Sequence, residues 1–237
     1  MTRPWRLLLV ALIAAIGLAV SAVGSASATM PQARSVTATA SANSGYVVTG
    51  ADGAYTTVSA TWTAPAVTCT ATASSSFWVG LDGFNSASVE QVGTEADCSG
   101  KTAEYFGWYE MYPAPPVDFA NSVKPGDAIA ASVTFSGADT YKLVLTDSTQ
   151  CWTRTITKNE VGLARSSAEV ITEGPSAAGP LADFGKVSYA KCDVNGTSLG
   201  LQNPTRLVIT DSSGHALDST SPITSAGAFN NTWLRSS

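Results

Sequence analysis

The most regular feature of the chain is a series of short runs in which apolar and polar residues alternate. Turn-forming residues, such as those at 50–53 and 124–127, separate the runs. An extended chain sends successive side chains to opposite faces, so alternation with period two predicts β-strands. The expected strands cover residues 46–49, 56–63, 76–81, 89–93, 103–112, 128–135, 141–147, 151–157, 167–172, 184–191 and 205–210.

Amphipathic helical stretches are almost missing from this pattern. A helical turn is expected at most over residues 159–164. Many short strands at close spacing indicate an all-β protein, and the length favours two packed sheets. We therefore expect a single two-sheet antiparallel β-sandwich domain over residues 45–237.

The first 28 residues have the pattern of a secretory signal peptide. Arg3 and Arg6 form a basic start, an apolar run follows over residues 7–20, and Ala26-Ser27-Ala28 gives a small-residue cleavage site. The apolar run, about 14 residues, is shorter than the ~20 that cross a bilayer. We expect a secreted, extracellular protein without a membrane partner. Residues 29–44 are small, polar and aperiodic, which indicates a flexible leader or short pro-segment.

The charge of the chain is negative and evenly spread. The formal net charge is −5, and removal of a signal with two arginines and no acidic residue makes it −7. No basic cluster is present that would neutralise phosphates, so nucleic acid is not an expected partner.

Four cysteines in an exported chain predict disulfide bonds. Four cysteines allow three pairings, and the sequence does not choose among them. We prefer Cys69 with Cys98 and Cys151 with Cys192.

Four of the expected strands carry tryptophans and polar residues two or four positions apart. Residues at this spacing lie on one face of a strand. The sets are Trp78 with Asp82, Gln91 with Glu95, Trp108 with Glu110 and Tyr112, and Glu169 with Glu173. If these strands are neighbours, aromatic rings and carboxylates share one face of the sheet, which is typical of a binding cleft.

Four motifs in order resemble the glutamic peptidases, or eqolisins. They are Phe-Trp-Val-Gly-Leu-Asp-Gly at 77–83, Gln-Val-Gly-Thr-Glu at 91–95, Trp-Tyr-Glu-Met-Tyr-Pro at 108–113 and Ala-Glu-Val-Ile-Thr-Glu at 168–173. The resemblance spans roughly residues 45–192 and is to a secreted, bacterial member. It implies an acid-acting endopeptidase on a concanavalin-like or jelly-roll-like sandwich of two antiparallel seven-stranded sheets, with the active site on the concave sheet.

The resemblance also implies site residues. The catalytic glutamine of the family falls on Gln91 and its catalytic glutamate on Glu173, with Glu169 as the alternative. Supporting or substrate-binding roles fall on Trp78, Asp82, Glu95, Trp108 and Glu110. The sequence departs from the family at Val170, where many members carry an aromatic residue, and at Glu95, where fungal members carry aspartate.

A carboxylate and an amide suffice in principle for peptide hydrolysis. Glu173, ionised at first, would take a proton from water and return it to the leaving nitrogen. Gln91 offers donors to the developing oxyanion and a carbonyl that orients the water, and it does not titrate.

Other chemistries have weaker support. The chain has one histidine, His215, and neither a Gly-x-Ser-x-Gly nor a His-Glu-x-x-His motif, so we expect no metal or cofactor. The expected partners are protein or peptide substrates, bound by a monomer. Two alternatives stay open: a glycosidase pair of Glu110 and Glu173, and a carbohydrate-binding module. The module would stack sugars on Trp78, Tyr105, Trp108 and Tyr109.

Overall fold

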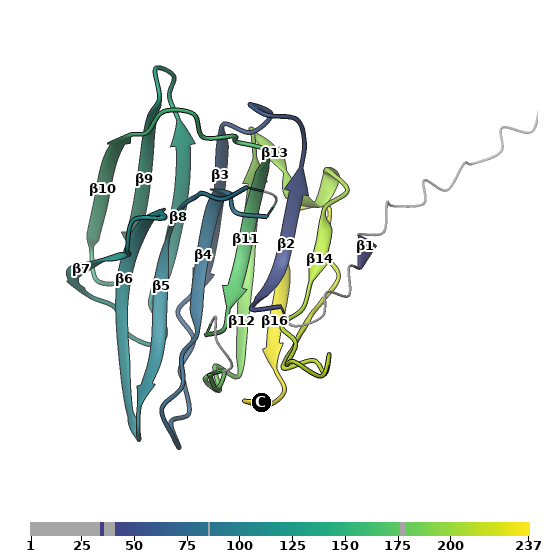
Figure 1. The fold of residues 1–237 in the computed structure, drawn as a ribbon. Coiled ribbons are helices and arrows are strands. Elements are labelled where there is room, and N and C mark those ends of the chain that lie inside the picture. Colours follow the sequence, from purple (N-terminus) through teal and green to yellow (C-terminus); the bar gives the residue numbers. More distant parts are fainter. Residues whose placement is uncertain (1–33, 36–40, 85, 176–178) are drawn as a thin grey trace, which may run out of the picture. The chain divides into compact units, whose positions relative to one another are not determined.

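The alternating runs form strands that assemble into two stacked sheets (Figure 1). The computed structural model describes residues 34–35, 41–84, 86–175 and 179–237, which belong to the compact unit Pro31–Ser237. The expected signal peptide, residues 1–28, lies outside the described residues. No helix within the described ranges is long and apolar enough to cross a membrane.

The first sheet has eight strands. In spatial order they are β1 (Arg34–Ser35), β14 (Thr205–Leu207), β2 (Asn43–Thr49), β11 (Ser167–Glu173), β4 (Ser76–Asp82), β5 (Val89–Ser99), β6 (Thr102–Tyr112) and β7 (Val117–Ser122). All neighbours pair antiparallel except β1 and β14, which are parallel. The sheet therefore has one strand more than the seven implied by the family resemblance.

The second sheet packs behind the first. Its order is β10 (Trp152–Asn159), β9 (Thr140–Asp147), β8 (Ala128–Phe135), β3 (Thr57–Thr63), β12 (Lys186–Val194), β16 (Phe229–Trp233) and β15 (Asp218–Thr220), with β13 (Thr197–Ser198) paired to β12. A 3-10 turn, Leu199–Leu201, is the helical element of the described chain.

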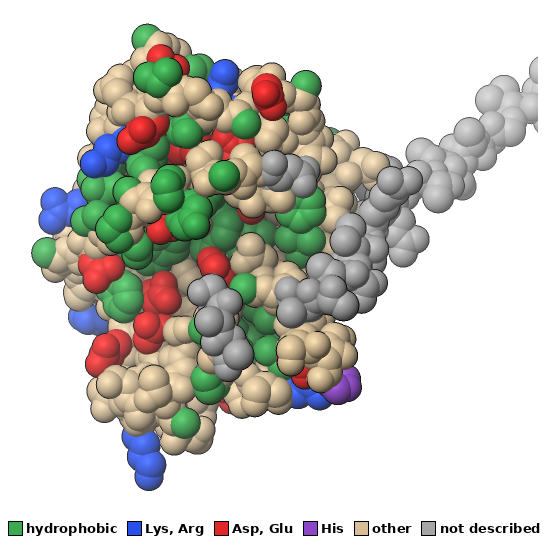
Figure 2. Space-filling model, viewed as in Figure 1, with side chains coloured by type: hydrophobic (Ala, Val, Ile, Leu, Met, Phe, Trp, Pro, Cys, Tyr) green, Lys and Arg blue, Asp and Glu red, His purple; other side chains and the backbone are tan. Residues whose placement is uncertain are grey.

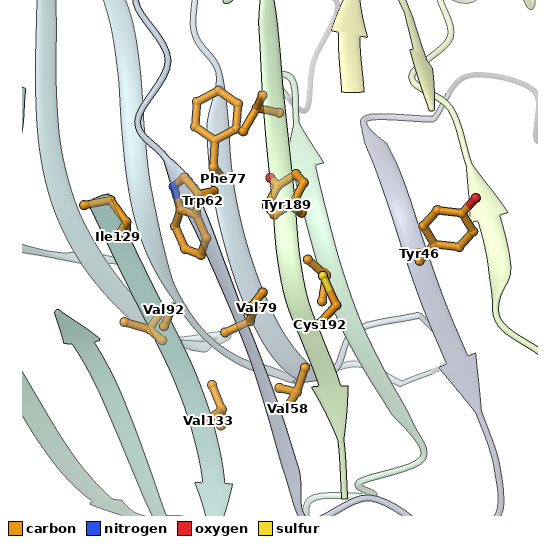
Figure 3. Close-up of a cluster of buried hydrophobic side chains, with 14 of the residues drawn as sticks. Tyr46, Val58, Trp62, Phe77, Val79, Val92, Ile129, Val133, Tyr189 and Cys192 are labelled. Atoms are coloured by element: carbon orange, nitrogen blue, oxygen red, sulfur yellow. The ribbon is translucent and has the colours of Figure 1, made fainter. Parts of the chain in front are cut away.

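The core lies between the two sheets and follows from strand alternation. Phe77, Val79 and Val92 point inward from the first sheet and meet Ile129 and Val133 of the second (Figure 3). Burying one such side chain stabilises the fold by about 1.5–3 kcal/mol. Burial in the core therefore fixes which face of each strand points inward. The outward face of the first sheet does not contribute to this core and can carry polar side chains.

A buried polar network ties β2 to the C-terminal strands of the second sheet. Asn231 Nδ2 donates to Ser44 Oγ, which in turn donates to Asp218 Oδ2. Asp218 Oδ1 accepts from the backbone N–H of Ile209 at 2.9 Å. Burial raises the pKa of Asp218 to about 6, and the hydrogen bond from Ser44 opposes the shift.

One of the two expected disulfides is present. Cys69 and Cys98 are bonded, with their Cα atoms 5.3 Å apart. The pairing of Cys151 with Cys192 was wrong, because both are free. Cys192 on β12 faces the core, whereas Cys151 is exposed beside β10, four strand positions away. That separation is roughly 19 Å at the usual strand spacing, far beyond disulfide reach.

Several element boundaries differ from expectation. β2 begins at Asn43 rather than near 45, and Arg34–Ser35 of the expected leader pairs with β14. Residues 160–164 contain no helical turn. β7, β15 and β16 were not expected; β7 begins within residues 113–119, which we expected to be a loop that forms a wall of the cleft.

The Glu90 side chain points into the hydrophobic core, where a charged carboxylate is unfavourable. It pairs with Leu81 and Met111, shares their inward orientation and is fully buried. Neither carboxyl oxygen has a hydrogen-bond partner among the described residues. Burial raises the pKa of Glu90 to about 8; nearby Asp82 adds to the shift and Arg165 opposes it. Glu90 is therefore protonated in acid, the form that the core tolerates.

Replacing Glu90 with glutamine should reduce the loss of stability at rising pH. The folded-state pKa lies above the ordinary 4.5, so the stabilising contribution is complete below pH 4.5 and is lost as the pH rises to about 8. When the pH is raised from 4.5 to 8, the unfolding free energy of Glu90→Gln should fall on the order of 2–4 kcal/mol less than that of wild type. Urea unfolding at both pH values measures this difference. Glu104→Gln, an exposed change at a residue that does not act on the Glu90 carboxyl, serves as control, and equal losses in wild type and Glu90→Gln would contradict the prediction.

Candidate active site

The outward face of the first sheet carries the predicted site residues in three rows across the strands. The first row runs from Glu169 through Gly80 and Gln91 to Glu110. The second row contains Ile171, Trp78, Gly93 and Trp108, and the third contains Glu173, Ser76, Glu95 and Phe106. The strand registers thus confirm that the four motifs share one face of neighbouring strands.

This face is hollowed into a cleft of about 420 Å³. Acidic side chains gather over β5, β6 and β7 beside the hollow, below a band of hydrophobic side chains (Figure 2). The lining residues are Ser74, Ser76, Gln91, Glu95, Phe106, Trp108, Glu110, Pro116, Asp118, Glu173, Gly174 and Pro175.

Gly93 lies between the two tryptophans of its row and lets strand β4 approach closely. A Cβ atom at this position would lie 2.2 Å from the carbonyl oxygen of Phe77 and 2.6 Å from Trp78 Cβ. A side chain there would collide with β4, so the position requires glycine.

Glu173 is held by the neighbouring strand. Trp78 Nε1 donates a hydrogen bond of 2.8 Å to Glu173 Oε2. Burial raises the pKa of Glu173 to about 7; the hydrogen bond from Trp78 lowers it, and the negative charge of Glu110 raises it. Below pH 7 the protonated form of Glu173 therefore predominates.

Gln91 and Glu110 are directly paired across β5 and β6. Gln91 Nε2 donates to Glu110 Oε2 at 2.5 Å. Burial raises the pKa of Glu110, and the hydrogen bond from Gln91 opposes this. The Gln91 side chain is only 6% exposed, and its Oε1 has no partner within the described part of the chain. The amide is oriented by Glu110 and keeps one free acceptor.

Glu95 extends the acidic wall on the same face of β5. Burial raises its pKa to about 8, and the charge of Asp97 adds to the shift. The Ser76 hydroxyl lowers it, and Glu173 raises it. Asp97 shows a smaller rise, to about 6, mainly from burial. Negative charge at this end of the cleft is thus suppressed in acid.

Asp82 and Glu169 do not line the cleft. Asp82 is buried and accepts hydrogen bonds from the backbone N–H groups of Arg165 and Ser166 at 2.7 and 2.8 Å. Glu169 is buried and accepts from Ser167 Oγ at 3.1 Å, and burial raises its pKa to about 8. These contacts hold the start of β11 against β4 and keep the Glu169 carboxyl outside the cleft.

The structure separates the predicted residues into two groups. Gln91, Glu95, Trp108, Glu110 and Glu173 line the cleft, and Trp78 contacts Glu173 from beside it. Among the other lining residues, sequence reasoning missed Ser74, Ser76 and Phe106. Ser76 and Phe106 share the spacing of Trp78 and Trp108, so strand parity could have found them. The other lining residues, Pro116, Asp118, Gly174 and Pro175, lie in segments 113–119 and 174–183, which we expected to form cleft walls.

Two aromatic residues of the carbohydrate-binding alternative face the other way. Tyr105 and Tyr109 pack against the core, and Tyr105 Oη accepts from the backbone N–H of Val67. Tyr109 stacks on Phe119 with ring centroids 5.8 Å apart. Neither ring lines the cleft, so the expected platform for sugar stacking is not formed.

Comparison with known proteins gives the family. A family model described as Peptidase A4 family matches residues 41–231. The chain belongs to the Peptidase A4 family. It is therefore a glutamic-type endopeptidase, a hydrolase. The match extends well beyond the resemblance found in the sequence, which ended near Cys192, because β14 to β16 complete the same fold.

Solved structures agree with this assignment. The chain is 26% identical to scytalido-glutamic peptidase with a transition state analog inhibitor, with a TM-score of 0.71, covering 82% of this chain and 98% of that one. Aspergilloglutamic peptidase from Aspergillus niger is also 26% identical, with a TM-score of 0.59, covering 68% of this chain and 99% of that one. A search of curated proteins found no match.

Replacing Trp78 with phenylalanine should move the acid limb of activity to higher pH. Phenylalanine keeps an aromatic ring but removes the N–H that stabilises ionised Glu173, so the pKa of Glu173 rises. Profiles of kcat/KM against pH measure the shift. Trp233→Phe is the matched control, because its Nε1 donates to Leu181 O in another part of the fold. An unchanged acid limb in Trp78→Phe would count against ionised Glu173 as the reacting form.

Proposed function

We propose that Glu173 and Gln91 are the catalytic pair of this peptidase and act on one water molecule. The observation that carries the proposal is their placement in one cleft, each held by a different neighbour. Trp78 orients the carboxylate, and Glu110 orients the amide while leaving Gln91 Oε1 free. Groups fixed before substrate arrives lose little entropy at reaction.

The reaction runs in two proton transfers. Ionised Glu173 takes a proton from the water as its oxygen attacks the peptide carbonyl carbon. The carbonyl oxygen becomes an oxyanion, which the second N–H of Gln91 Nε2 stabilises. Glu173 then returns the proton to the peptide nitrogen, and the C–N bond breaks to give a carboxylic acid and an amine. Glu173 ends the cycle ionised, as it began.

The raised pKa of Glu173 determines how much of its carboxyl group is ionised in acid. In acid the ionised form is a minority, and its fraction falls about tenfold for each pH unit below the pKa. The same shift makes the ionised form a stronger base toward water. Gln91 does not titrate, so its contribution is constant across this range.

We also propose that the chain is exported and cleaved after Ala28, and acts as a monomer on proteins and peptides. The Cys69–Cys98 bond supports an oxidising compartment. N-terminal sequencing of material secreted by an expressing cell should find Thr29 first. Retention of the full chain inside the cell would contradict export.

Substitution of the pair tests the proposed function. Denatured casein, incubated with each variant between about pH 2 and 6, should be cleaved by wild type and by Glu169→Gln, but not by Glu173→Gln. Gln91→Ala should lose about 3 kcal/mol of transition-state stabilisation, or about a hundredfold in kcat.

Glu169→Gln is the matched control, since it makes the same chemical change on the same strand outside the cleft. Loss of cleavage in Glu169→Gln with retention in Glu173→Gln would reverse the assignment. Retention of wild-type protein on insoluble polysaccharide with no cleavage of casein would instead favour a binding module.

A further inference from the structure

The hydroxyl group of Ser44 has two acceptors within hydrogen-bond distance and a single proton to donate. Ser44 Oγ lies 3.3 Å from the backbone carbonyl oxygen of Thr172 and 2.5 Å from Asp218 Oδ2. A serine hydroxyl donates one hydrogen bond and can accept two. Ser44 therefore donates to Thr172 O or to Asp218 Oδ2 but not to both, and the choice changes a contact to the residue before Glu173.

The protonation state of Asp218 decides between the two acceptors. An ionised Asp218 only accepts, so it takes the Ser44 proton. A protonated Asp218 carries its proton on Oδ2, because its Oδ1 accepts from the backbone N–H of Ile209 at 2.9 Å. It then donates to Ser44 Oγ, where Asn231 Nδ2 is a second donor. Because both lone pairs of Ser44 Oγ are then occupied, Ser44 turns its own O–H to Thr172 O.

The polar groups around Asp218 are neutral. β2 contributes Ser44, β16 contributes Asn231, and the backbone N–H of Ile209 is the third group. Tyr189 of β12 is close enough for the charge of Asp218 to raise its pKa, which lies well above 10, so Tyr189 stays a neutral hydroxyl. Burial raises the pKa of Asp218 to about 6, and no charged neighbour among the described residues contributes to the shift. Asp218 therefore gains its proton in acid.

The other side-chain contacts to this part of β11 do not depend on pH in this range. Tyr189 Oη donates to Ile171 O at 2.7 Å and accepts from Thr172 Oγ1 at 2.9 Å. Burial raises the pKa of the Cys192 thiol, which β12 also turns to the core, to about 12, so this group is neutral too. The bond from Ser44 is therefore the contact that responds to acid on the core side of this strand.

We propose that Ser44 is a positioning residue for Glu173, and that protonation of Asp218 turns its hydroxyl from Asp218 to the Thr172 carbonyl. In acid, β11 gains a hydrogen bond directly before the residue that carries the proposed catalytic carboxylate. Loss of the proton from Asp218 withdraws this bond, although the carboxylate of Glu173 lies on the opposite face of the sheet. The positioning role rests on the proposed catalytic pair, whereas the turning of the hydroxyl does not.

NMR of the Thr172 carbonyl group tests where the Ser44 proton lies. In the Glu173→Gln variant, threonine labelled with carbonyl 13C and glutamine labelled with 15N mark the peptide bond between residues 172 and 173. The chain has one other Thr-Gln bond, at residues 149–150, so two signals are expected. The variant also removes the titration of residue 173 itself. The Thr172 carbonyl signal should shift with a midpoint near pH 6, as Asp218 gains its proton.

Two further changes in that variant identify the cause of the shift. Asp218→Asn keeps an acceptor for the N–H of Ile209 and offers an N–H to Ser44 Oγ at every pH, so the Thr172 carbonyl signal should stay at its acid position. Ser44→Ala removes the hydroxyl and should abolish the shift. A shift with the same midpoint in Asp218→Asn would overturn the inference, even if Ser44→Ala does not fold.

Profiles of kcat/KM against pH distinguish positioning from a purely structural role. Relative to wild type, Ser44→Ala should lose about fivefold in kcat/KM for a peptide substrate at pH 4, as for one hydrogen bond, and less at pH 7, where the hydroxyl has turned away. Tyr189→Phe is the matched control: it removes the bond to the adjacent carbonyl, Ile171 O, and should change kcat/KM by the same factor at both pH values. An equal effect of Ser44→Ala at both pH values would overturn the positioning role.

The outcomes separate this inference from the proposed function. If Glu173→Gln abolishes cleavage of casein but its Thr172 carbonyl signal does not shift near pH 6, the inference is wrong and the catalytic pair stands. If Glu173→Gln still cleaves casein, the proposed function falls and the positioning role falls with it, whatever the carbonyl signal shows.

Discussion

The hydrogen bond from Trp78 to Glu173 is the interaction on which the site depends most. It fixes a carboxylate at the end of β11 by means of a ring from the middle of β4. The ring has room because Gly80 and Gly93 carry no side chains beside it. Two glycines therefore leave room for the ring that orients a titratable carboxyl group on another strand, so backbone packing and the proposed acid–base chemistry are linked in this cleft.

Several carboxyl groups are buried by the packing of the sheets, and burial favours their protonated form. Glu90 lies inside the sandwich, and Glu95 and Glu169 lie on the opposite face, yet burial raises the pKa of all three to about 8. A protonated carboxyl is an ordinary polar group, whereas an unpaired carboxylate in the same place is costly. Acid therefore favours both the folded state and a less negative cleft.

Alternation was enough to predict most strands because burial on the inner face follows it closely; β8 was expected at the bounds observed. The catalytic candidates followed from motif and parity, since a strand register preserves side-chain direction. Strand order did not follow, because it depends on long-range pairing. For that reason the partner of Cys151 was predicted wrongly, and strand β7 was not foreseen beside the cleft wall that we expected at residues 113–119.

The network of Ser44, Asp218 and Asn231 makes the C-terminal strands part of the support for the cleft. Ser44 pairs with Thr172, the residue before Glu173, and its hydroxyl is held by two residues that come more than 170 positions later. Strands β15 and β16 must therefore be in place before this section of β11 has its full support on the core side. A chain that lacked these strands would carry Glu173 and Gln91 but not this support for the strand that positions Glu173.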